Sequence, residues 1–178
     1  VDDGSSDNTS ELIKSKYATE LSSGQIQYIY QANSGVCRAR NNGLQHARYD
    51  WIAYIDSDNV WFNNFLDTFT EYIMSSQSKC LYAMRIMQSN GAVDGRGFNW
   101  DNLLHGNYID LGSFVHHIDL YKALGGFDEN MTRLVDWDFV VRYTRDNVPE
   151  YIQRPVFLYD DLNDRRRISN MDTYEKNL

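Results

Sequence analysis

One short stretch, residues 51–59, limits the folds that are open to this sequence. It runs from Trp51 to Asn59 as an apolar and aromatic segment that leads directly into Asp56 and Asp58. An unbroken apolar run of this length is typical of a strand buried on both faces of a mainly parallel sheet. Ligands of open α/β sheets bind outside the carboxyl ends of the strands. The stretch therefore predicts an α/β fold with a ligand site where this strand ends.

The two carboxylates after this strand suggest a metal. Asp56 and Asp58 are two residues apart, so they would share one face of an ideal strand. Paired hard oxygen donors suit Mg²⁺ or Mn²⁺, which take one or two carboxylates and complete their shell with substrate phosphates. The alternative is a polar turn without a ligand, because Asp, Ser and Asn favour turns. This stretch alone leaves both interpretations open.

Strand and helix patterns alternate along the first half of the chain, as in a parallel sheet with right-handed crossovers. The second half is less regular and carries further strand candidates, including one interrupted by Pro155. We expect a Rossmann-like three-layer α/β domain, a mainly parallel mixed sheet flanked by helices. The expected helices start near residues 9, 36, 62, 118 and 136, and the expected strands cover 26–30, 51–55, 81–87, 111–118 and 151–159.

The size and charge of the chain narrow the class of function. Its 178 residues fit a single domain, with a first half at 1–78, a second half at 79–160 and a tail at 161–178. A net charge of −8 argues against nucleic acid as a partner. Cys37 and Cys80 are predicted to be reduced core residues, which is typical of a cytoplasmic protein. Peripheral contact with the inner face of a membrane stays open.

Residues in two other motifs could bind a phosphorylated ligand. Asp3 lies in a loop at the end of the first expected strand, where its carboxylate could accept hydrogen bonds from a base edge or a ribose. The alternative is an ordinary helix-capping loop. Arg40 shares a helix face with apolar residues, so we expect it to point toward the sheet and to reach a diphosphate. Arg165 and Arg167 in the tail could clamp phosphates, or could be a solvated charge run.

The third acidic motif begins a helix. Asp136 is in register with the apolar residues Phe139, Val140 and Tyr143, so it is predicted to face the sheet, whereas Asp138 is predicted to face away. If one of them is a catalytic base, Asp136 is the better candidate, because desolvation by a substrate would raise its basicity. The alternative is that both aspartates only decorate a helix start.

Taken together, these motifs resemble those of the family 2 inverting glycosyltransferases, which have the GT-A fold. The resemblance rests on four motifs in family order: Val1 to Thr9, Asn33 to Leu44, Asp56 to Asn59, and Gly125 to Glu129 followed by Asp136 to Phe139. The family pattern usually begins with a strand and a helix before the first motif, so we expect such a segment upstream of Val1. Val135 departs from the acidic or polar residue that is common there, which leaves Asp136 to act alone.

The resemblance implies a role for each candidate. Asp3 would contact the base of a nucleotide and Asp56 its ribose, with Arg40 also binding the nucleotide. Asp58 would hold Mn²⁺ or Mg²⁺, and Asp136 would be the general base. The implied partners are a nucleoside-diphosphate sugar, with a UDP-sugar as the expected donor, and a saccharide or lipid-linked acceptor.

The implied reaction is an inverting, metal-dependent sugar transfer in polysaccharide or glycoconjugate synthesis. Two alternatives stand beside it. The chain could be an inactive domain that only binds nucleotide sugars. The segment Tyr54 to Val60 also resembles the signature of haloacid-dehalogenase phosphatases, in which Asp56 would be the nucleophile.

Overall fold

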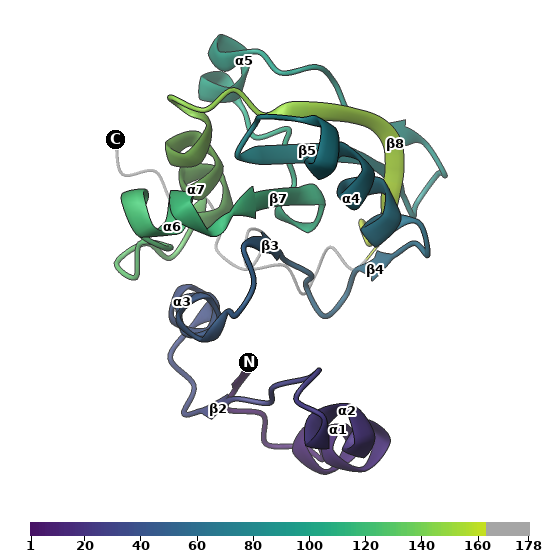
Figure 1. Ribbon diagram of the computed structural model, residues 1–178, viewed down its shortest axis with the longest axis vertical. Helices are drawn as coiled ribbons and strands as arrows, with labels where there is room; N and C mark the ends of the chain where they lie inside the picture. The colour runs from purple at the N-terminus through teal and green to yellow at the C-terminus, as the bar shows by residue number, and fades with distance from the viewer. Residues whose placement is uncertain (163–178) are drawn as a thin grey trace. The chain divides into compact units, whose positions relative to one another are not determined.

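The computed structural model describes residues 1–162, and the chain forms two compact units (Figure 1). Unit 1 contains residues 1–48 and 126–131, and unit 2 contains residues 49–125 and the chain from 132 onward. The resemblance implies a nucleotide-binding half at 1–78 and an acceptor-binding half at 79–160, and this division stays a prediction.

Unit 1 is built as the strand and helix pattern predicts. Strands β1 (Asp2–Asp3) and β2 (Tyr30–Gln31) pair in parallel, with Asp2 opposite Tyr30. Between them lie α1 (Thr9–Lys16) and α2 (Ala18–Ser22), and α3 (Val36–His46) follows β2. The expected strand at 26–30 is shorter and begins later, because only two residues reach the ladder.

Unit 2 contains a six-stranded sheet. Five strands follow the order β3-β7-β5-β8-β4, and β6 pairs with β5. The strands are β3 (Trp51–Ala53), β4 (Val60–Trp61), β5 (Cys80–Met87), β6 (Val93–Asp94), β7 (Phe114–His117) and β8 (Glu150–Tyr159). Its helical segments are α4 (Phe65–Ser75), α5 (Trp100–His105), the 3-10 turn η1 (Leu111–Ser113), α6 (Ile118–Leu124) and α7 (Val135–Thr144).

The mixed α/β class is confirmed, but two details differ from expectation. Within this sheet only β5 and β8 pair in parallel, because β6 returns beside β5 as a hairpin and β7 inserts antiparallel between β3 and β5. Strand β3 is not buried on both faces. It is the end strand of the described sheet, and Ile55 just beyond it is 48% exposed. An apolar run alone does not reveal whether a strand becomes central or lateral.

Helices cover both faces of this sheet, as a three-layer domain requires. On one face Phe65 and Phe69 of α4 pack with Val115 of β7 and residues of β5 and β8. On the other face Phe114 and His116 contact rings of α7. Neighbouring residues of β7 thus serve opposite layers, because successive side chains of a strand point to opposite faces.

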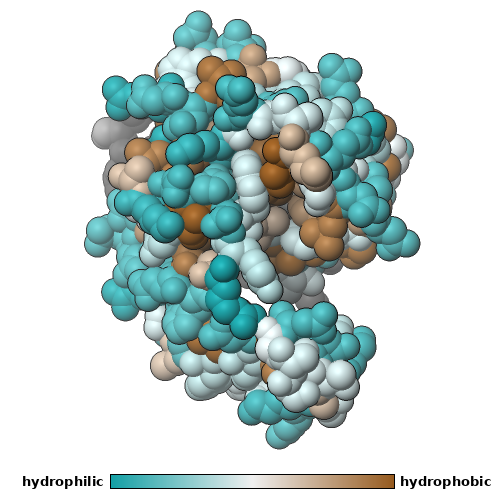
Figure 2. Space-filling model, viewed as in Figure 1, coloured by the Kyte–Doolittle hydropathy of each residue, from teal (hydrophilic) through white to brown (hydrophobic). Residues whose placement is uncertain are grey.

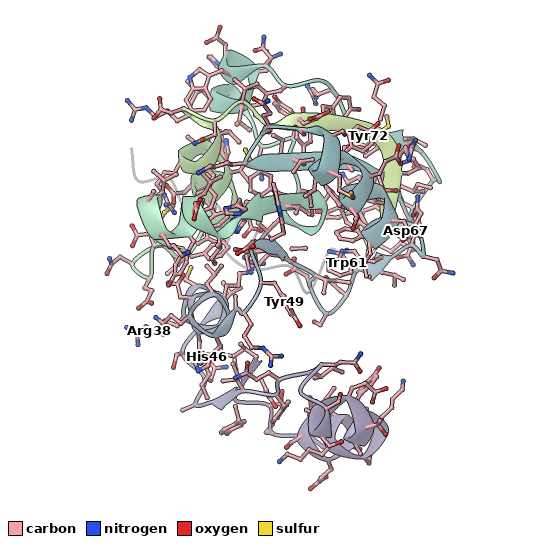
Figure 3. All side chains as sticks on the ribbon, viewed as in Figure 1. Arg38, His46, Tyr49, Trp61, Asp67 and Tyr72 are labelled. Carbon is pink, nitrogen blue, oxygen red and sulfur yellow. The ribbon has the colours of Figure 1, made fainter. Side chains whose placement is uncertain are left out.

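Local irregularities follow the sequence. The ladder between β5 and β8 shifts register where Met84 lies opposite Pro155, as expected for a proline that cannot donate to a sheet. Helix α5 had no clear pattern and was missed. Trp61 of β4 lies beside α4, whose Asp67 and Tyr72 are labelled in Figure 3. It stacks on Phe65 with 3.9 Å between ring centroids, so it serves the core.

On the face shown in Figure 2 hydrophobic residues are interspersed with hydrophilic ones. No helix within residues 1–162 is both long and apolar enough to cross a membrane. Cys37 and Cys80 are both buried, each with a free thiol.

Candidate functional site

The chain turns a few residues after β3, at the predicted metal motif. The backbone N–H of Asn59 donates to the carbonyl of Asp56 at 3.1 Å, which closes a tight turn over Ser57 and Asp58. Asp56 is half-buried at the base of the turn, whereas Asp58 at its tip is exposed. Asn59 ties the turn to the end of β8, because its side-chain oxygen accepts from the N–H of Asp160 at 3.2 Å. We call residues 56–59 the acidic turn.

Helix α7 presents the predicted base. Leu134, just before the helix, adopts φ +57°, a left-handed conformation that is strained for a residue with a side chain. Asp138 forms an ion pair at 2.8 Å with Arg142, which lies four residues later on the same face of the helix. Phe139, Val140 and Tyr143 are fully buried, as the helical register predicted. Asp136 is half-buried at the first turn.

Asp110 is a functional candidate that the sequence did not reveal. It caps the 3-10 turn η1 by accepting from the N–H of Gly112 at 2.8 Å, and only 17% of its side chain is exposed. Burial raises the pKa of its carboxyl, and the charges of Asp56 and Asp136 raise it further, against the opposing effect of Arg85. Unit 2 therefore brings Asp56, Asp110 and Asp136 within electrostatic range of one another.

The fourth group in this region is cationic. Arg85 of β5 binds Asp110 through Nη1 at 2.9 Å and Asp94 of β6 through Nη2 at 2.7 Å, and its guanidinium lies 4.5 Å from the ring centroid of Tyr159. An arginine fork suits two carboxylates at once. The spacing of Arg85, Asp94 and Asp110 along the chain does not predict this ion-pair network.

In unit 1 the carboxylate of Asp3 binds its own chain. It accepts from the N–H of Ser34 at 2.8 Å, the N–H of Gly35 at 2.9 Å and the amide of Gln31 at 2.8 Å. Partial burial opposes ionisation of Asp3, but these hydrogen bonds prevail and lower its pKa. Since a carboxylate has about four acceptor positions, roughly one remains for a ligand.

The glycine next to Asp3 permits a close approach within unit 1. Gly4 has φ +82°, and a Cβ there would meet the backbone nitrogen of Asn33 at 2.7 Å. The close approach that Gly4 allows is therefore to its own chain. Asp2 is buried beside it and accepts from the hydroxyl of Tyr28 and the N–H of Ser5. The hydrogen bond from Tyr28 is the main reason for the lowered pKa of Asp2.

Helix α3 positions the predicted arginine. Arg40 is half-buried, with its guanidinium 5.2 Å from the ring centroid of Phe127. Asn41 fastens the same segment, because its side-chain oxygen accepts from the N–H of Phe127 at 2.8 Å and its amide donates to Glu129 at 3.0 Å. Arg38 also pairs with Glu129, at 3.1 Å.

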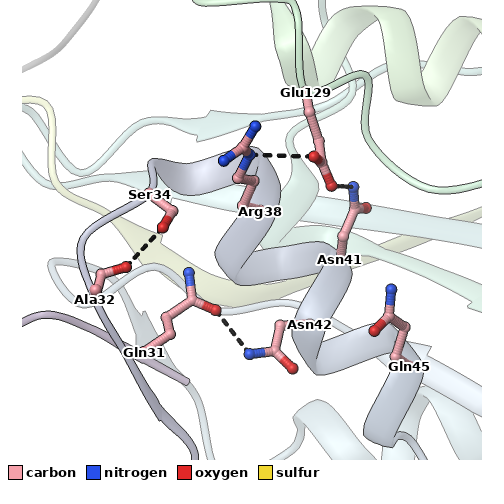
Figure 4. Close-up of a pocket in the computed structure, with 8 residues that line it drawn as sticks. All are labelled: Gln31, Ala32, Ser34, Arg38, Asn41, Asn42, Gln45 and Glu129. Carbon is pink, nitrogen blue, oxygen red and sulfur yellow. Dashed lines mark hydrogen bonds and ion pairs between the residues drawn. The ribbon is translucent and has the colours of Figure 1, made fainter.

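A polar pocket of about 380 Å³ lies on the same helix (Figure 4). It is lined by Gln31, Ala32, Ser34, Arg38, Asn41, Asn42, Gln45 and Glu129. Most of these side chains bind one another, as Asn42 does by donating to Gln31 at 2.7 Å. Gln31 and Ser34 also donate to Asp3, so the pocket shares a wall with the Asp3 loop.

The predicted site residues thus form two groups. Asp3 and Arg40 belong to unit 1, and Asp56, Asp58 and Asp136 belong to unit 2. That both groups share one rim stays a prediction. Arg165 and Arg167 lie outside the described residues.

The metal expectation concerns unit 2. Among residues 1–162 no three or more His, Cys, Asp and Glu side chains cluster in a way that could hold a metal ion. Mg²⁺ and Mn²⁺ do not require such a cluster, because one or two carboxylates suffice when substrate phosphates supply the remaining ligands. The exposed carboxylate of Asp58 fits that requirement.

Comparison with known proteins identifies the family. The model of the family described as "Glycosyl transferase family 2" matches residues 1–111, well over half of the chain. The chain belongs to glycosyl transferase family 2. The match covers β1, α3 and the acidic turn, which carry three of the four motifs on which the resemblance was based.

Curated relatives of this glycosyltransferase domain include two bacterial synthases. The chain is 22% identical to a chondroitin synthase of Pasteurella multocida (strain Pm70) over 182 residues, and 23% identical to a hyaluronan synthase of Pasteurella multocida over 147 residues. These alignments cover 98% and 79% of the chain, but only 18% and 15% of the relatives. The family 2 domain thus spans a small part of each.

Solved structures confirm the fold. The structure of S. aureus TarS residues 1–349 in complex with UDP-GlcNAc matches with a TM-score of 0.74 at 16% identity, over 90% of this chain and 48% of that one. A second structure of the same TarS segment matches with a TM-score of 0.72 at 17% identity, over 89% of this chain and 49% of that one. This structural similarity confirms the expected GT-A fold.

Proposed function

We propose that the complete protein transfers a sugar from a nucleoside-diphosphate sugar to an acceptor hydroxyl, with inversion at the anomeric carbon. Family membership supports the reaction class. The observation that carries the proposal is that the match to the family covers β1, α3 and the acidic turn. The charges of Asp56 and Asp136 also act on the Asp110 carboxyl. A residue of the acidic turn and the first turn of α7 therefore belong to one acidic region, as a donor site beside a general base requires.

A UDP-sugar is the proposed donor. The similar fold of TarS in its complex with UDP-GlcNAc supports this choice. Asp3 would contact the base with its remaining acceptor position, Asp56 the ribose, and Arg40 the nucleotide. The hydrogen bonds from Ser34 and Gly35 hold the Asp3 carboxylate in one orientation, which reduces the entropy that donor binding would cost.

Mn²⁺ or Mg²⁺ is the proposed cofactor, with Asp58 as its protein ligand. When bound, such an ion neutralises charge on the departing nucleoside diphosphate. The exposure of Asp58 at the tip of the acidic turn leaves its carboxylate accessible to an ion that arrives with the donor. The backbone carbonyl of Asp56 holds the turn closed by accepting the hydrogen bond from the N–H of Asn59.

Asp136 is the proposed general base, taking the proton of the acceptor hydroxyl as it attacks the anomeric carbon. Its position in the first turn of α7 favours the carboxylate form, because the helix N-terminus is electropositive. Asp138, two residues later, forms an ion pair with Arg142, so we do not assign it the role of the base.

The acceptor is proposed to be a saccharide or a lipid-linked saccharide, in polysaccharide or glycoconjugate synthesis. The names of the chondroitin and hyaluronan synthases support the polymer class. Buried thiols accord with a reducing, cytoplasmic location. A lipid-linked acceptor would bring the protein to the inner face of a membrane.

A matched pair of variants tests the function. Asp136→Asn in the complete protein should lower transfer by at least about 100-fold, the lower end of what a general base contributes. Donor affinity measured by calorimetry should stay within about threefold. Asp138→Asn lies on the same helical turn and should keep nearly full activity. Full turnover by Asp136→Asn overturns the assignment of the base.

Two alternatives give different results in the same assay. An inactive nucleotide-sugar-binding domain would bind the donor while the wild-type protein neither transfers nor hydrolyses it. A phosphatase with Asp56 as nucleophile would release phosphate from small phosphate esters, an activity that the family match does not support.

A further inference from the structure

A buried histidine contacts both the segment that leads to the acidic turn and helix α7. His116 of β7 is 0% exposed and is surrounded by the rings of Tyr54, Phe114, Phe139 and Tyr143, at centroid distances of 4.9 to 6.1 Å. A polar ring in such a place costs free energy unless its nitrogens are hydrogen-bonded. A phenylalanine would fill a similar volume without that cost, so an imidazole at this position depends on its hydrogen bonds.

The hydrogen bonds of His116 define its tautomer. Nδ1 lies 3.0 Å from the backbone carbonyl of His117, which can only accept, so Nδ1 carries the proton. Burial lowers the pKa of His116 to about 4, so the ring is neutral near pH 7. Nε2 is then an acceptor, and the hydroxyl of Tyr54 donates to it at 2.9 Å.

Tyr54 connects this histidine to the acidic turn. It lies in the segment between β3 and the turn, two residues before Asp56. Its ring is nearly parallel to that of His116, at 25°, and meets Phe139 of α7 edge-on at 5.8 Å. Phe139 is three residues after Asp136, close to one helical turn. Tyr54 thus contacts both His116 of β7 and the helix that carries Asp136.

We propose that His116 is a positioning residue, which holds the acidic turn against helix α7 through its hydrogen bond from Tyr54. The inference deepens the proposed function and rests on it. It makes no claim that His116 touches the substrate. Its effect is to keep the donor-side carboxylates and Asp136 in one relative geometry, because misplacement by about 1 Å can cost roughly 100-fold in rate.

The chain offers a matched control for this hydrogen bond. Tyr143 belongs to the same aromatic cluster, and its hydroxyl donates to the carbonyl of Gly125 at 2.8 Å. Tyr54→Phe and Tyr143→Phe each remove one bonded hydroxyl and keep the ring. Only the Tyr54 change breaks the link from β7 to the acidic turn.

Two measurements on the complete protein test the proposal. Hydrogen exchange should be roughly fivefold faster for backbone amides at 55–59 in Tyr54→Phe and unchanged there in Tyr143→Phe, as expected for the loss of one hydrogen bond. The kcat for transfer should fall about 10- to 100-fold in Tyr54→Phe, with the donor KM within about threefold. Unchanged exchange at 55–59, or an equal loss of kcat in both variants, overturns the proposal.

Variants of His116 itself provide the second arm. His116→Gln offers a carbonyl acceptor to Tyr54, whereas His116→Phe offers none. The glutamine variant should therefore retain clearly more kcat and slower exchange at 55–59 than the phenylalanine variant, and equal losses contradict the role of the hydrogen bond. If the wild-type protein shows no turnover, the proposed function fails, while the exchange results still decide whether His116 orders the turn.

Discussion

The guanidinium of Arg85 lies 2.9 Å from the carboxylate of Asp110 in unit 2. Both side chains are mostly buried, at 18% and 17% exposed. The pair places one positive charge next to a carboxylate on which Asp56 and Asp136 also act. It therefore offsets part of the repulsion that would otherwise oppose gathering these aspartates.

The first prediction concerns this pair. Arg85→Met should lower the free energy of unfolding by about 3 kcal/mol, because it leaves a buried carboxylate without its cation. The double variant Arg85→Met with Asp110→Asn should recover part of that loss. Urea unfolding measures both. Arg154→Met is the control, since its pair with Glu71 is exposed to solvent and should contribute little to stability. A similar loss in both arginine variants would contradict the prediction.

The second prediction concerns pH. The pKa of His116 is about 4 in the folded chain and 6.5 in its ordinary state. Between these pH values the unfolded chain binds more protons than the folded chain. The free energy of unfolding therefore rises as the pH increases from about 4 to 6.5, and it no longer depends on His116 above that range. The difference corresponds to about 3 kcal/mol at 1.36 kcal/mol per pKa unit.

The measurement for this prediction compares unfolding of the wild-type protein and His116→Gln from pH 4.5 to 7.5. The stability difference between the two proteins should grow with pH across the lower part of this range. A difference that is constant with pH would show that His116 is not buried as a neutral ring.

The third prediction concerns the proposed ion. Asp58→Ala should remove the increase in nucleotide affinity that Mn²⁺ causes in the wild-type protein, because the exposed turn loses its metal ligand. Calorimetric titration of UDP with and without Mn²⁺ measures it. Asp67→Ala, at an exposed position on α4, is the control and should leave the Mn²⁺ effect intact. Retained Mn²⁺ dependence in Asp58→Ala would exclude this ligand.

The fourth prediction concerns the loop that Asp3 holds. Asp3→Ala removes the acceptor for two backbone N–H groups, so amide exchange at Ser34 and Gly35 should accelerate and stability should fall by about 1 kcal/mol. Donor affinity should fall as well. Asp7→Ala is the control, because Asp7 accepts its hydrogen bonds from the nearby Thr9 and not from residues 34 and 35. If exchange at these two residues is the same in both variants, Asp3 does not organise the loop.

Local pattern predicted much of this molecule. Helical spacing placed α3 and α7 correctly, and it predicted the buried residues Phe139, Val140 and Tyr143 of α7. Pro155 was expected to interrupt its strand, and the ladder shifts register there. These features depend on neighbouring residues only, and backbone periodicity and the missing N–H of proline act locally.

Pairing between distant segments was not predictable in the same way. The run from Trp51 was expected to be buried on both faces, yet β3 is the end strand of its sheet, beside β7. Asp110 lies in an irregular stretch with no periodicity, and its importance comes from Arg85, 25 residues earlier. Such contacts depend on which strands meet, and many arrangements satisfy the same hydrophobic pattern.

The sequence by itself determined the family, the order of its motifs and the acidic residues that carry them, because these depend on residue type and spacing. Only the tertiary structure decided what surrounds those residues. It paired Arg85 with Asp110, and it brought His116 into contact with both Tyr54 and α7. The reason is physical: burial, charge proximity and hydrogen-bond partners arise only when segments distant in the chain pack together.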